Sequence, residues 1–260
     1  RARGGSAATA AAFAAPLVPT RFIGRVGADE LGDVLTGRLR DSGVDVRVQR
    51  GGRTGSVVVL VHEDGERTML PDRGASAGLG PVPARWLDGA RFLHVPAYAF
   101  ATEPATSSAY DLIKAATGRC CAVTLDASST AFLAEYGPAR YLDLVADIRP
   151  AVLFANSAEA DVLGLADRPP PAGTTFVIKG GAAPTTVRRA SGEEIRVPVP
   201  AYRRARDTTG AGDAFAAGYL ASVVGGGDAS AAVRAGHRHA ARVLDTPGAG
   251  FAIEPPLEAT

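Results

Sequence analysis

From residue 91 onward, short apolar stretches alternate with longer segments of helical character. The short stretches predict strands and the longer segments predict helices. Strands that alternate with helices form a mostly parallel sheet with helices on both faces. The pattern therefore predicts an α/β, doubly wound fold, in which ligands bind beyond the carboxyl ends of the strands. We expect strands at 91–95, 121–126, 152–155 and 175–179, and helices at 106–117, 130–136, 139–145, 157–163, 212–224 and 229–244.

The part of the chain before residue 91 has a different pattern. Two apolar runs, 56–62 and 67–70, flank the turn Glu63-Asp64-Gly65-Glu66 and predict a β-hairpin. We expect this hairpin to form a small sheet that projects from the body of a single domain spanning 1–260. The remaining expected elements are helices at 6–15 and 29–42, strands at 20–26 and 44–49, and a second hairpin at 186–189 and 194–199.

Composition excludes several classes of function. The formal net charge is +1 and aromatic residues make up 6%, which argues against a nucleic-acid-binding protein. No apolar stretch approaches the roughly 18 residues that span a bilayer, so no membrane association is expected. The cysteines, Cys120 and Cys121, are adjacent and are expected to stay reduced, which fits a cytoplasmic protein.

Residues 207–215 read Asp-Thr-Thr-Gly-Ala-Gly-Asp-Ala-Phe and precede an Ala-rich segment with helical character. Glycines let the backbone turn tightly and approach a ligand, and the amides at a helix start attract an anion. Asp213 falls in the first turn of this helix. Capping alone could explain its position, since acidic residues are common there. An anion cradle beside an acid also fits phosphoryl transfer, in which the acid takes a hydroxyl proton.

Further polar residues follow the predicted strands. Asn156 and Glu159 could order Mg²⁺ through water, or form a variant of the helix capping box, which the local sequence favours. Lys179, followed by Gly180, could reach a phosphate as a point charge or extend toward solvent from a strand end. In a parallel sheet these turns could lie along one edge and form one site.

Other nucleotide-binding and catalytic motifs are absent from the sequence. There is no Gly-Lys-Ser or Gly-Lys-Thr, so a Walker A loop is excluded. The dinucleotide fingerprint fails because Phe215 occupies the third glycine position, which argues against an oxidoreductase. His237 and His239 are two apart on a predicted helix and cannot share a face. They are expected at the surface or lining a pocket, and the histidines show no metal-binding spacing.

The sequence resembles the PfkB/ribokinase family of sugar and nucleoside kinases. Residues 207–215 match the C-terminal signature of that family, and the similarity spans nearly the whole chain. The supporting segments are Gly4-Gly5, Phe22 to Asp29 with Gly32, Thr54-Gly55, Asn156-x-x-Glu159, and Ala240-Ala241-x-Val243 with Gly248-Ala249. The resemblance implies a ribokinase-like fold and ATP-dependent phosphorylation of a hydroxyl on a small sugar or sugar-like molecule.

The resemblance also implies roles for individual residues. Asp213 would be the catalytic base, and the amides of Gly210, Ala211 and Gly212 would form the anion hole. Residues implied to bind nucleotide are Lys179, Gly180, Thr208, Asn156, His237 and Gly248. Residues implied to bind the acceptor are Gly4, Gly5, Thr9, Arg67 and Asp213. Asn156 and Glu159 would hold Mg²⁺ through water, and Asp207 and Thr209 would border a monovalent cation such as K⁺. Residues 49–70 would form part of a small β lid, through which a homodimer could form.

Two departures from the family pattern concern the acceptor side. Family members usually begin with a strand that carries a substrate-binding Asp ahead of the glycine pair, whereas this sequence starts at Arg1. We therefore expect the sequence shown to be incomplete. Thr9 stands where the family has Asn, and Arg67 could meet an anionic substrate or simply be solvated. These departures leave a second hypothesis open: a catalytically impaired, kinase-like protein that binds nucleotide or sugar and has a regulatory role.

Overall fold

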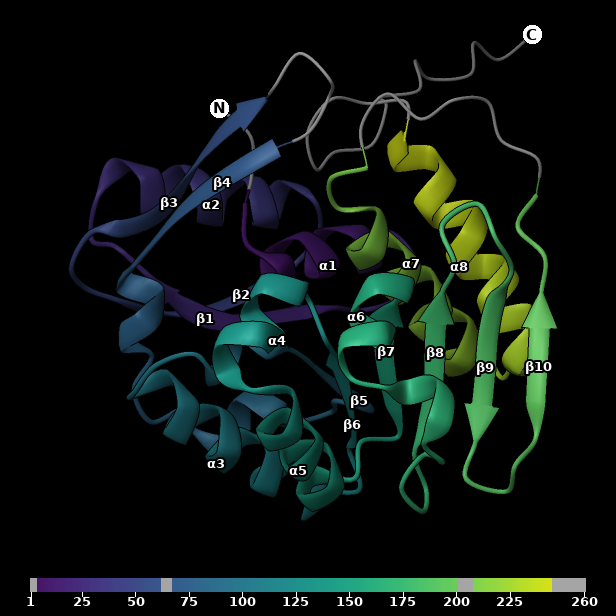
Figure 1. The fold of residues 1–260 in the computed structure, drawn as a ribbon. Coiled ribbons are helices and arrows are strands. Elements are labelled where there is room, and N and C mark those ends of the chain that lie inside the picture. Colours follow the sequence, from purple (N-terminus) through teal and green to yellow (C-terminus); the bar gives the residue numbers. More distant parts are fainter. Residues whose placement is uncertain (1–3, 62–66, 201–207, 245–260) are drawn as a thin grey trace, which may run out of the picture.

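The computed structural model describes residues 4–61, 67–200 and 208–244, and it contains a six-stranded sheet flanked by helices (Figure 1). The strand order is β10-β9-β8-β7-β6-β5. Neighbours from β5 to β8 pair in parallel, and β9 and β10 complete the sheet as antiparallel strands. The strands are β5 (Phe92–Pro96), β6 (Ala122–Asp126), β7 (Val152–Asn156), β8 (Thr175–Lys179), β9 (Thr185–Arg189) and β10 (Glu194–Val197).

Both faces of this sheet are covered, because successive side chains of a strand point to opposite faces. In β7, Leu153 and Ala155 pack with helices α3 to α6, whereas Val152 and Phe154 pack with α7 and α8. This arrangement confirms the predicted doubly wound fold. The helices are α3 (Ala105–Thr117), α4 (Thr130–Tyr136), α5 (Pro138–Ile148), α6 (Ser157–Val162), α7 (Ala211–Val224) and α8 (Ala229–Leu244).

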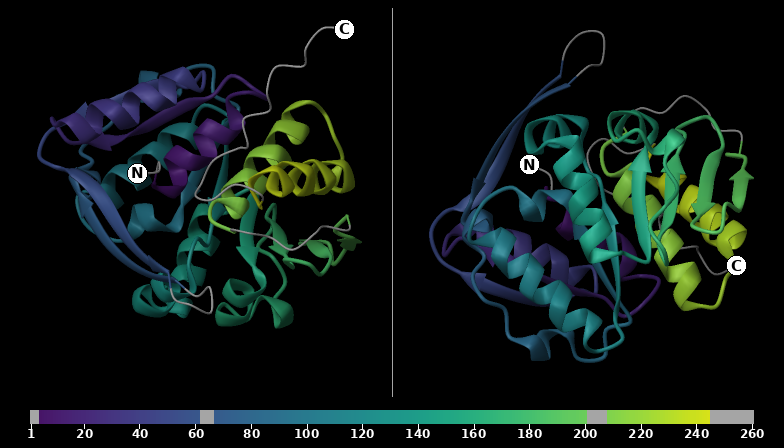
Figure 2. Two further views of the ribbon diagram at one scale, coloured as in Figure 1. Left: turned by 90° about the horizontal axis from the view of Figure 1, so that it is seen from above. Right: turned by 60° about the horizontal axis from the view of Figure 1, so that its bottom comes forward.

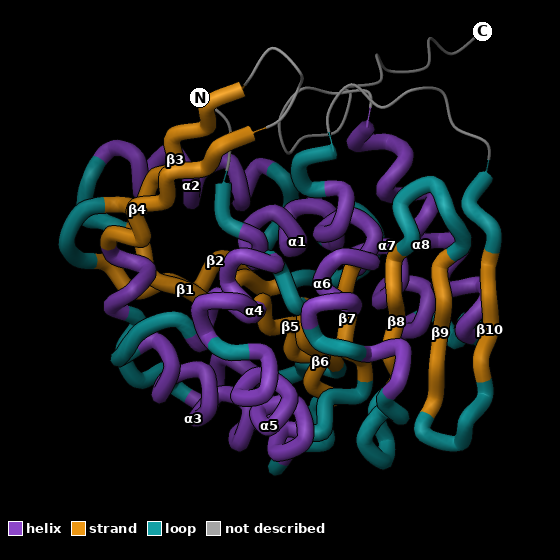
Figure 3. Tube along the Cα trace, viewed as in Figure 1, coloured by secondary structure: helices purple, strands orange, loops and turns teal. Residues whose placement is uncertain are grey.

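The amino-terminal strands form a sheet of their own. After α1 (Ser6–Ala14), strands β1 (Arg21–Val26) and β2 (Asp45–Arg50) pair in parallel, and helix α2 (Glu30–Asp41) connects them. Ile23 of β1 packs against the core cluster that contains β5. Within the described ranges no strand pairs with the outer edge of β1 or of β5. The strands are therefore divided between sheets, as Figure 3 shows.

The predicted hairpin is confirmed and projects from the body of the molecule (Figure 2). It consists of β3 (Thr54–Val61) and β4 (Arg67–Gly74), paired antiparallel. Its root is fixed to α2 by Asp29, whose carboxylate accepts hydrogen bonds from the Thr54 amide at 2.7 Å and the Gly32 amide at 2.9 Å. The hairpin is thus anchored at one end and exposed along its length.

Short 3₁₀ helices, which the sequence analysis did not anticipate, occur at Ala75–Gly78, Ala84–Leu87, Ala97–Phe100 and Leu165–Asp167. Their three or four residues are too few to show a helical apolar period. Among the helices in the described ranges, none combines the length and the apolar character that a bilayer crossing requires.

Candidate active site

The loop that the sequence singled out ends at the amino terminus of α7. Gly210 precedes the helix with φ of 81°, a left-handed conformation that favours glycine. The Ala211 amide donates to the Thr208 carbonyl at 3.1 Å, and the Ala214 amide donates to the Gly210 carbonyl at 2.9 Å. The half-buried Asp213 lies in the first turn. The Asp213 carboxylate therefore lies at the amino end of α7, beside the backbone amides that the sequence predicted for an anion site.

Helix α1 brings the amino-terminal glycines to the same place. Phe13 of α1 packs with Ala214 and Ala217 of α7, which holds the two helices together. Ser6, the first residue of α1, donates a hydrogen bond of 2.6 Å from its hydroxyl to Asp213 Oδ1. The exposed pair Gly4-Gly5 directly precedes this contact, so both glycines lie near the start of α7.

Thr9 lies one turn further along α1 and is buried. Its amide donates to the Gly5 carbonyl at 2.9 Å. Its role in acceptor binding remains a prediction.

The carboxyl ends of three neighbouring strands supply the next group of side chains. Asp126 ends β6, Asn156 ends β7 and Lys179 ends β8, and the last two are direct partners in the parallel register. Parallel strands place these ends at one edge of the sheet, as the sequence analysis expected. Asp126 was not predicted as a site residue, although an acidic residue that ends the apolar run 121–126 was an available signal.

Lys179 and Asp126 form an ion pair at this edge. Lys179 Nζ lies 3.0 Å from Asp126 Oδ2, and the two side chains are 14% and 8% exposed. The ammonium also lies against α7, because a Cβ built on Gly212 would be 3.3 Å from Lys179 Nζ. Burial alone would lower the pKa of Lys179, but the nearby carboxylates of Asp126 and Glu159 raise it above its ordinary value. Lys179 is therefore a largely buried cation at the helix end, and the solvent-extended alternative is wrong.

Asn156 and Glu159 form a capping box at the start of α6. Asn156 Oδ1 accepts from the Glu159 amide at 2.9 Å, and Glu159 Oε2 accepts from the Asn156 amide at 2.8 Å. The interpretation that the local sequence favoured is thus confirmed. Burial raises the pKa of Glu159, and the Asp126 carboxylate raises it further. Among the described residues no cluster of three or more His, Cys, Asp or Glu side chains could hold a metal ion.

The two histidines of α8 are both buried, so the surface position that the sequence analysis allowed is wrong. His237 Nε2 lies 2.8 Å from Thr185 Oγ1, and His239 Nε2 donates to the Phe13 carbonyl at 2.9 Å. These partners let an imidazole pack inside the fold, which the spacing of the histidines could not reveal. Burial lowers the pKa of both side chains.

Of the remaining predicted site residues, the structure describes some and leaves others outside the described ranges. Gly180 directly follows β8, and Thr208 is exposed just before Thr209 and Gly210. Arg67 begins β4, but its side chain lies outside what the structure describes. Asp207 and Gly248 also lie outside the described residues. The predicted cation site and one predicted nucleotide contact therefore remain predictions.

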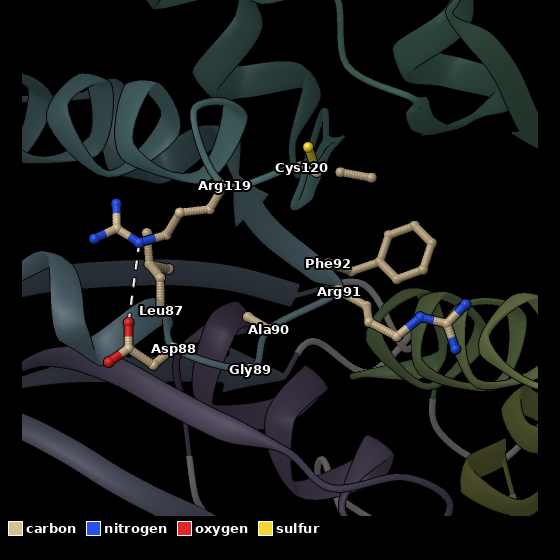
Figure 4. Close-up of a pocket in the computed structure, with 9 residues that line it drawn as sticks. Leu87, Asp88, Gly89, Ala90, Arg91, Phe92, Arg119 and Cys120 are labelled. Atoms are coloured by element: carbon tan, nitrogen blue, oxygen red, sulfur yellow. Dashed lines mark ion pairs between the residues drawn. The ribbon is translucent and has the colours of Figure 1, made fainter.

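A pocket of about 680 Å³ lies away from this site (Figure 4). It is lined by the segment from Leu87 to Phe92 and by Arg119, Cys120 and Ala122, which places it at the amino ends of β5 and β6. Arg119 Nε lies 3.9 Å from Asp88 Oδ1 across it. Asp126 and Lys179 lie at the carboxyl ends of their strands, so this pocket is on the opposite side of the sheet, at the amino ends of the strands.

Comparison with known proteins identifies the family. Residues 1–255 match the pfkB family of carbohydrate kinases. The chain belongs to this family. The ATP-dependent ribose-1-phosphate kinase of Halopiger xanaduensis is 32% identical to it over 247 residues, covering 88% of this chain and 76% of that protein.

Solved structures agree with this pfkB-family membership. Adenosine kinase from Sinorhizobium meliloti has a TM-score of 0.85 at 25% identity, covering 95% of this chain and 79% of that chain. Fructokinase from Vibrio cholerae, in its fructose, ADP and calcium ion bound form, has a TM-score of 0.80 at 25% identity, covering 96% and 87%. The fold is ribokinase-like, and the pfkB-family chain is a sugar or nucleoside kinase.

Proposed function

We propose that this pfkB-family protein transfers the terminal phosphoryl group of ATP to a hydroxyl of a small sugar or sugar-like molecule, with Asp213 as the catalytic base. One observation carries the proposal. A carboxylate, an ammonium and the amino end of a helix meet at the first turn of α7, through Asp213, Lys179 and Gly212. Phosphoryl transfer needs these three elements: a proton acceptor, a cation and backbone donors.

Asp213 would accept the proton of the attacking hydroxyl. The Ser6 hydroxyl already donates to Asp213 Oδ1, which orients the carboxylate. The acceptor would enter beside Gly4 and Gly5, where a side chain on either residue would meet open space. The amides at 210–213 would serve as the anion hole. The Gly212 amide has no hydrogen-bond acceptor among the described residues, so it suits this role.

The positive charge on the donor side suits the phosphates of a nucleoside triphosphate. Lys179 supplies a buried positive charge next to Gly212, and Gly180 and Thr208 lie in the adjoining turns. Asn156 and Glu159 are proposed to hold Mg²⁺ through water, which fits the buried Glu159 carboxylate, since Mg²⁺ usually keeps several waters. When bound, Mg²⁺ would neutralise phosphate charge. His237 and Gly248 on the base side, and K⁺ beside Asp207 and Thr209, remain part of the proposal.

The relatives support a sugar-like acceptor. They include kinases named for ribose 1-phosphate, adenosine and fructose, which share a sugar hydroxyl. Ribose 1-phosphate is the first acceptor to test because that kinase is 32% identical to this chain. Arg67, at the start of β4, is proposed to approach the acceptor from the hairpin.

We propose that residues 1–260 act as one kinase domain and that residues 49–70, with the rest of the hairpin, act as a lid. Both faces of the hairpin carry exposed apolar side chains. Val59 is paired with Met69 on one face, and Val58 with Leu70 on the other. One face can close over the acceptor and exclude water, while the other can pair with a second copy of the chain. Leu70→Lys should then shift a dimer toward monomer in sedimentation velocity, whereas a monomeric wild-type protein would contradict pairing.

We also propose a cytoplasmic location. Cys120 and Cys121 are both free thiols in the structure, as expected for a protein from a reducing compartment.

The function is tested by measuring ADP formation with a panel of acceptors. The panel contains ribose 1-phosphate, ribose, fructose, 2-keto-3-deoxygluconate and adenosine, each with Mg²⁺ and ATP. The proposal predicts acceptor-dependent ADP release for at least one compound and a matching phosphorylated product by mass spectrometry. Nucleotide binding without turnover for every acceptor would instead support the regulatory alternative.

A further inference from the structure

The ion pair with Asp126 fixes the position of the Lys179 ammonium. Asp126 Oδ1 accepts the Ser128 amide at 2.8 Å, and Asp126 Oδ2 accepts Lys179 Nζ at 3.0 Å. Ser128 is itself tied down, because its hydroxyl accepts the Ala97 amide at 3.1 Å and donates to the Asp126 carbonyl at 3.0 Å. Both oxygens of the buried carboxylate are therefore engaged, and its orientation is set by the turn after β6.

This orientation decides where the ammonium lies. A lysine side chain has a flexible four-carbon stem, so an unrestrained ammonium samples many positions. The amino end of a helix also carries partial positive charge, which disfavours a nearby cation. Lys179 Nζ nevertheless lies against Gly212 in the first turn of α7. The negative charge of Asp126, 3.0 Å from the ammonium, offsets this repulsion.

Resting on the proposed function, we propose that Asp126 is a positioning residue that holds Lys179 against the first turn of α7, so that Lys179 contacts the terminal phosphoryl group of the nucleotide. Gly212 and Asp213 are consecutive, and Asp213 is the proposed base. The group that must lie between this turn and the acceptor hydroxyl is the transferred phosphoryl group. A cation fixed at Gly212 is therefore directed at that group, and the inner phosphates lie further from the acceptor.

The test compares two ligands that differ by the terminal phosphoryl group. Calorimetry gives the Kd of Mg·ADP and of the Mg complex of the non-hydrolysable β,γ-imido analogue of ATP. The proteins are wild type, Asp126→Asn, Lys179→Met and the double variant. Asp45→Asn is the matched control, because it removes the same charge from an ion pair with Arg21 between β1 and β2. This control should bind both ligands as wild type does.

Each single variant at the site should weaken analogue binding by about 10-fold, the loss of one charge-assisted contact, and change ADP binding by less than about 2-fold. If Asp126 acts through Lys179, Asp126→Asn should weaken analogue binding no further in the Lys179→Met background. Equal losses for both ligands, or additive losses in the double variant, would overturn the proposal, because they indicate a general structural role.

A substitute variant and a binding readout keep the experiment decisive. If Asp126→Asn does not fold, Asp126→Glu keeps the charge and should give a smaller loss confined to the analogue, whereas equal losses for the two ligands would again overturn the proposal. The readout is equilibrium binding, so a protein that binds nucleotide but phosphorylates no acceptor would defeat the kinase proposal and still test Asp126. Failure of wild type to bind either ligand would overturn both.

Discussion

Ser6 and Asp213 are 207 positions apart in sequence and are joined by a hydrogen bond of 2.6 Å from the Ser6 hydroxyl to Asp213 Oδ1. The contact links the first residue of α1 to the first turn of α7. It depends on the packing of Phe13 against Ala214 and Ala217. The acceptor side and the phosphoryl side of the proposed site are therefore held together by one rigid helix pair.

Ser6→Ala should lower kcat about 10-fold, corresponding to about 1.4 kcal/mol in the barrier. The variant removes a donor that orients the base but leaves the helices packed, so the melting temperature should stay close to that of wild type. Steady-state kinetics and thermal unfolding measure the two quantities. Ser107→Ala is the matched control, since the exposed Ser107 hydroxyl donates to the Glu103 carboxylate at 2.7 Å away from the site. A kcat equal to that of the control would show that Ser6 does not position Asp213.

Two glycines of α7 predict opposite outcomes. A Cβ at Gly212 would lie 3.3 Å from the flexible end of Lys179, whereas a Cβ at Gly218 would lie 2.7 Å from the Ala235 carbonyl of α8. Gly212→Ala should therefore reduce activity with little loss of stability. Gly218→Ala should lower the free energy of unfolding by about 1–3 kcal/mol, the cost of overpacking a tight helix contact. Chemical denaturation and initial rates distinguish them, and a stable Gly218→Ala protein would contradict the close α7–α8 contact.

Much of the fold could be predicted from the chain, because the apolar strands of the central sheet have turn residues on both sides. Strand 175–179 was predicted with the observed bounds, and the hairpin of β3 and β4 was located by its turn. The separation of β1 and β2 from the main sheet could not be predicted. Pairing between strands depends on which edges meet in space, and local periodicity carries no information about this.

The site was predictable where its residues lie in one segment and was missed where they come from distant segments. Residues 210–213 and the Asn156–Glu159 capping box follow from local spacing. Ser6 and Asp126 were missed because their significance depends on partners 207 and 53 positions away. The burial of His237 was missed for the same reason, since this residue of α8 has its partner, Thr185, on β9.

Asp29→Ala should loosen the root of the hairpin. The Asp29 carboxylate accepts hydrogen bonds from the Thr54 hydroxyl, the Thr54 amide and the Gly32 amide at the start of α2, and these hydrogen bonds lower its pKa. Without it, backbone amide exchange in β3 should accelerate by about 10-fold or more, as local opening becomes easier. Hydrogen-exchange mass spectrometry measures this. Asp41→Ala, an exposed change at the other end of α2, should leave exchange in β3 unchanged, and the same exchange in both variants would argue against the anchor.

Stability should fall as pH drops below 6.5. Burial lowers the pKa of His94, His237 and His239 from 6.5. The unfolded chain therefore binds protons that the folded protein does not, and each such group costs up to about 1.4 kcal/mol per pH unit until its folded pKa is reached. His239→Gln keeps a donor for the Phe13 carbonyl but cannot be protonated. Urea denaturation between pH 7.5 and 5.5 should show a shallower loss for this variant. Parallel curves would mean that His239 titrates normally in the folded protein.

The most direct test of the account is single-turnover phosphoryl transfer by Asp213→Asn. Asparagine keeps an oxygen that can accept from Ser6, so the fold and the affinity for Mg·ATP should match wild type. The variant has no carboxylate to take the hydroxyl proton, so the rate of transfer should fall by about 10²–10⁴-fold. A variant that binds nucleotide normally and transfers phosphoryl at close to the wild-type rate would contradict Asp213 as the catalytic base.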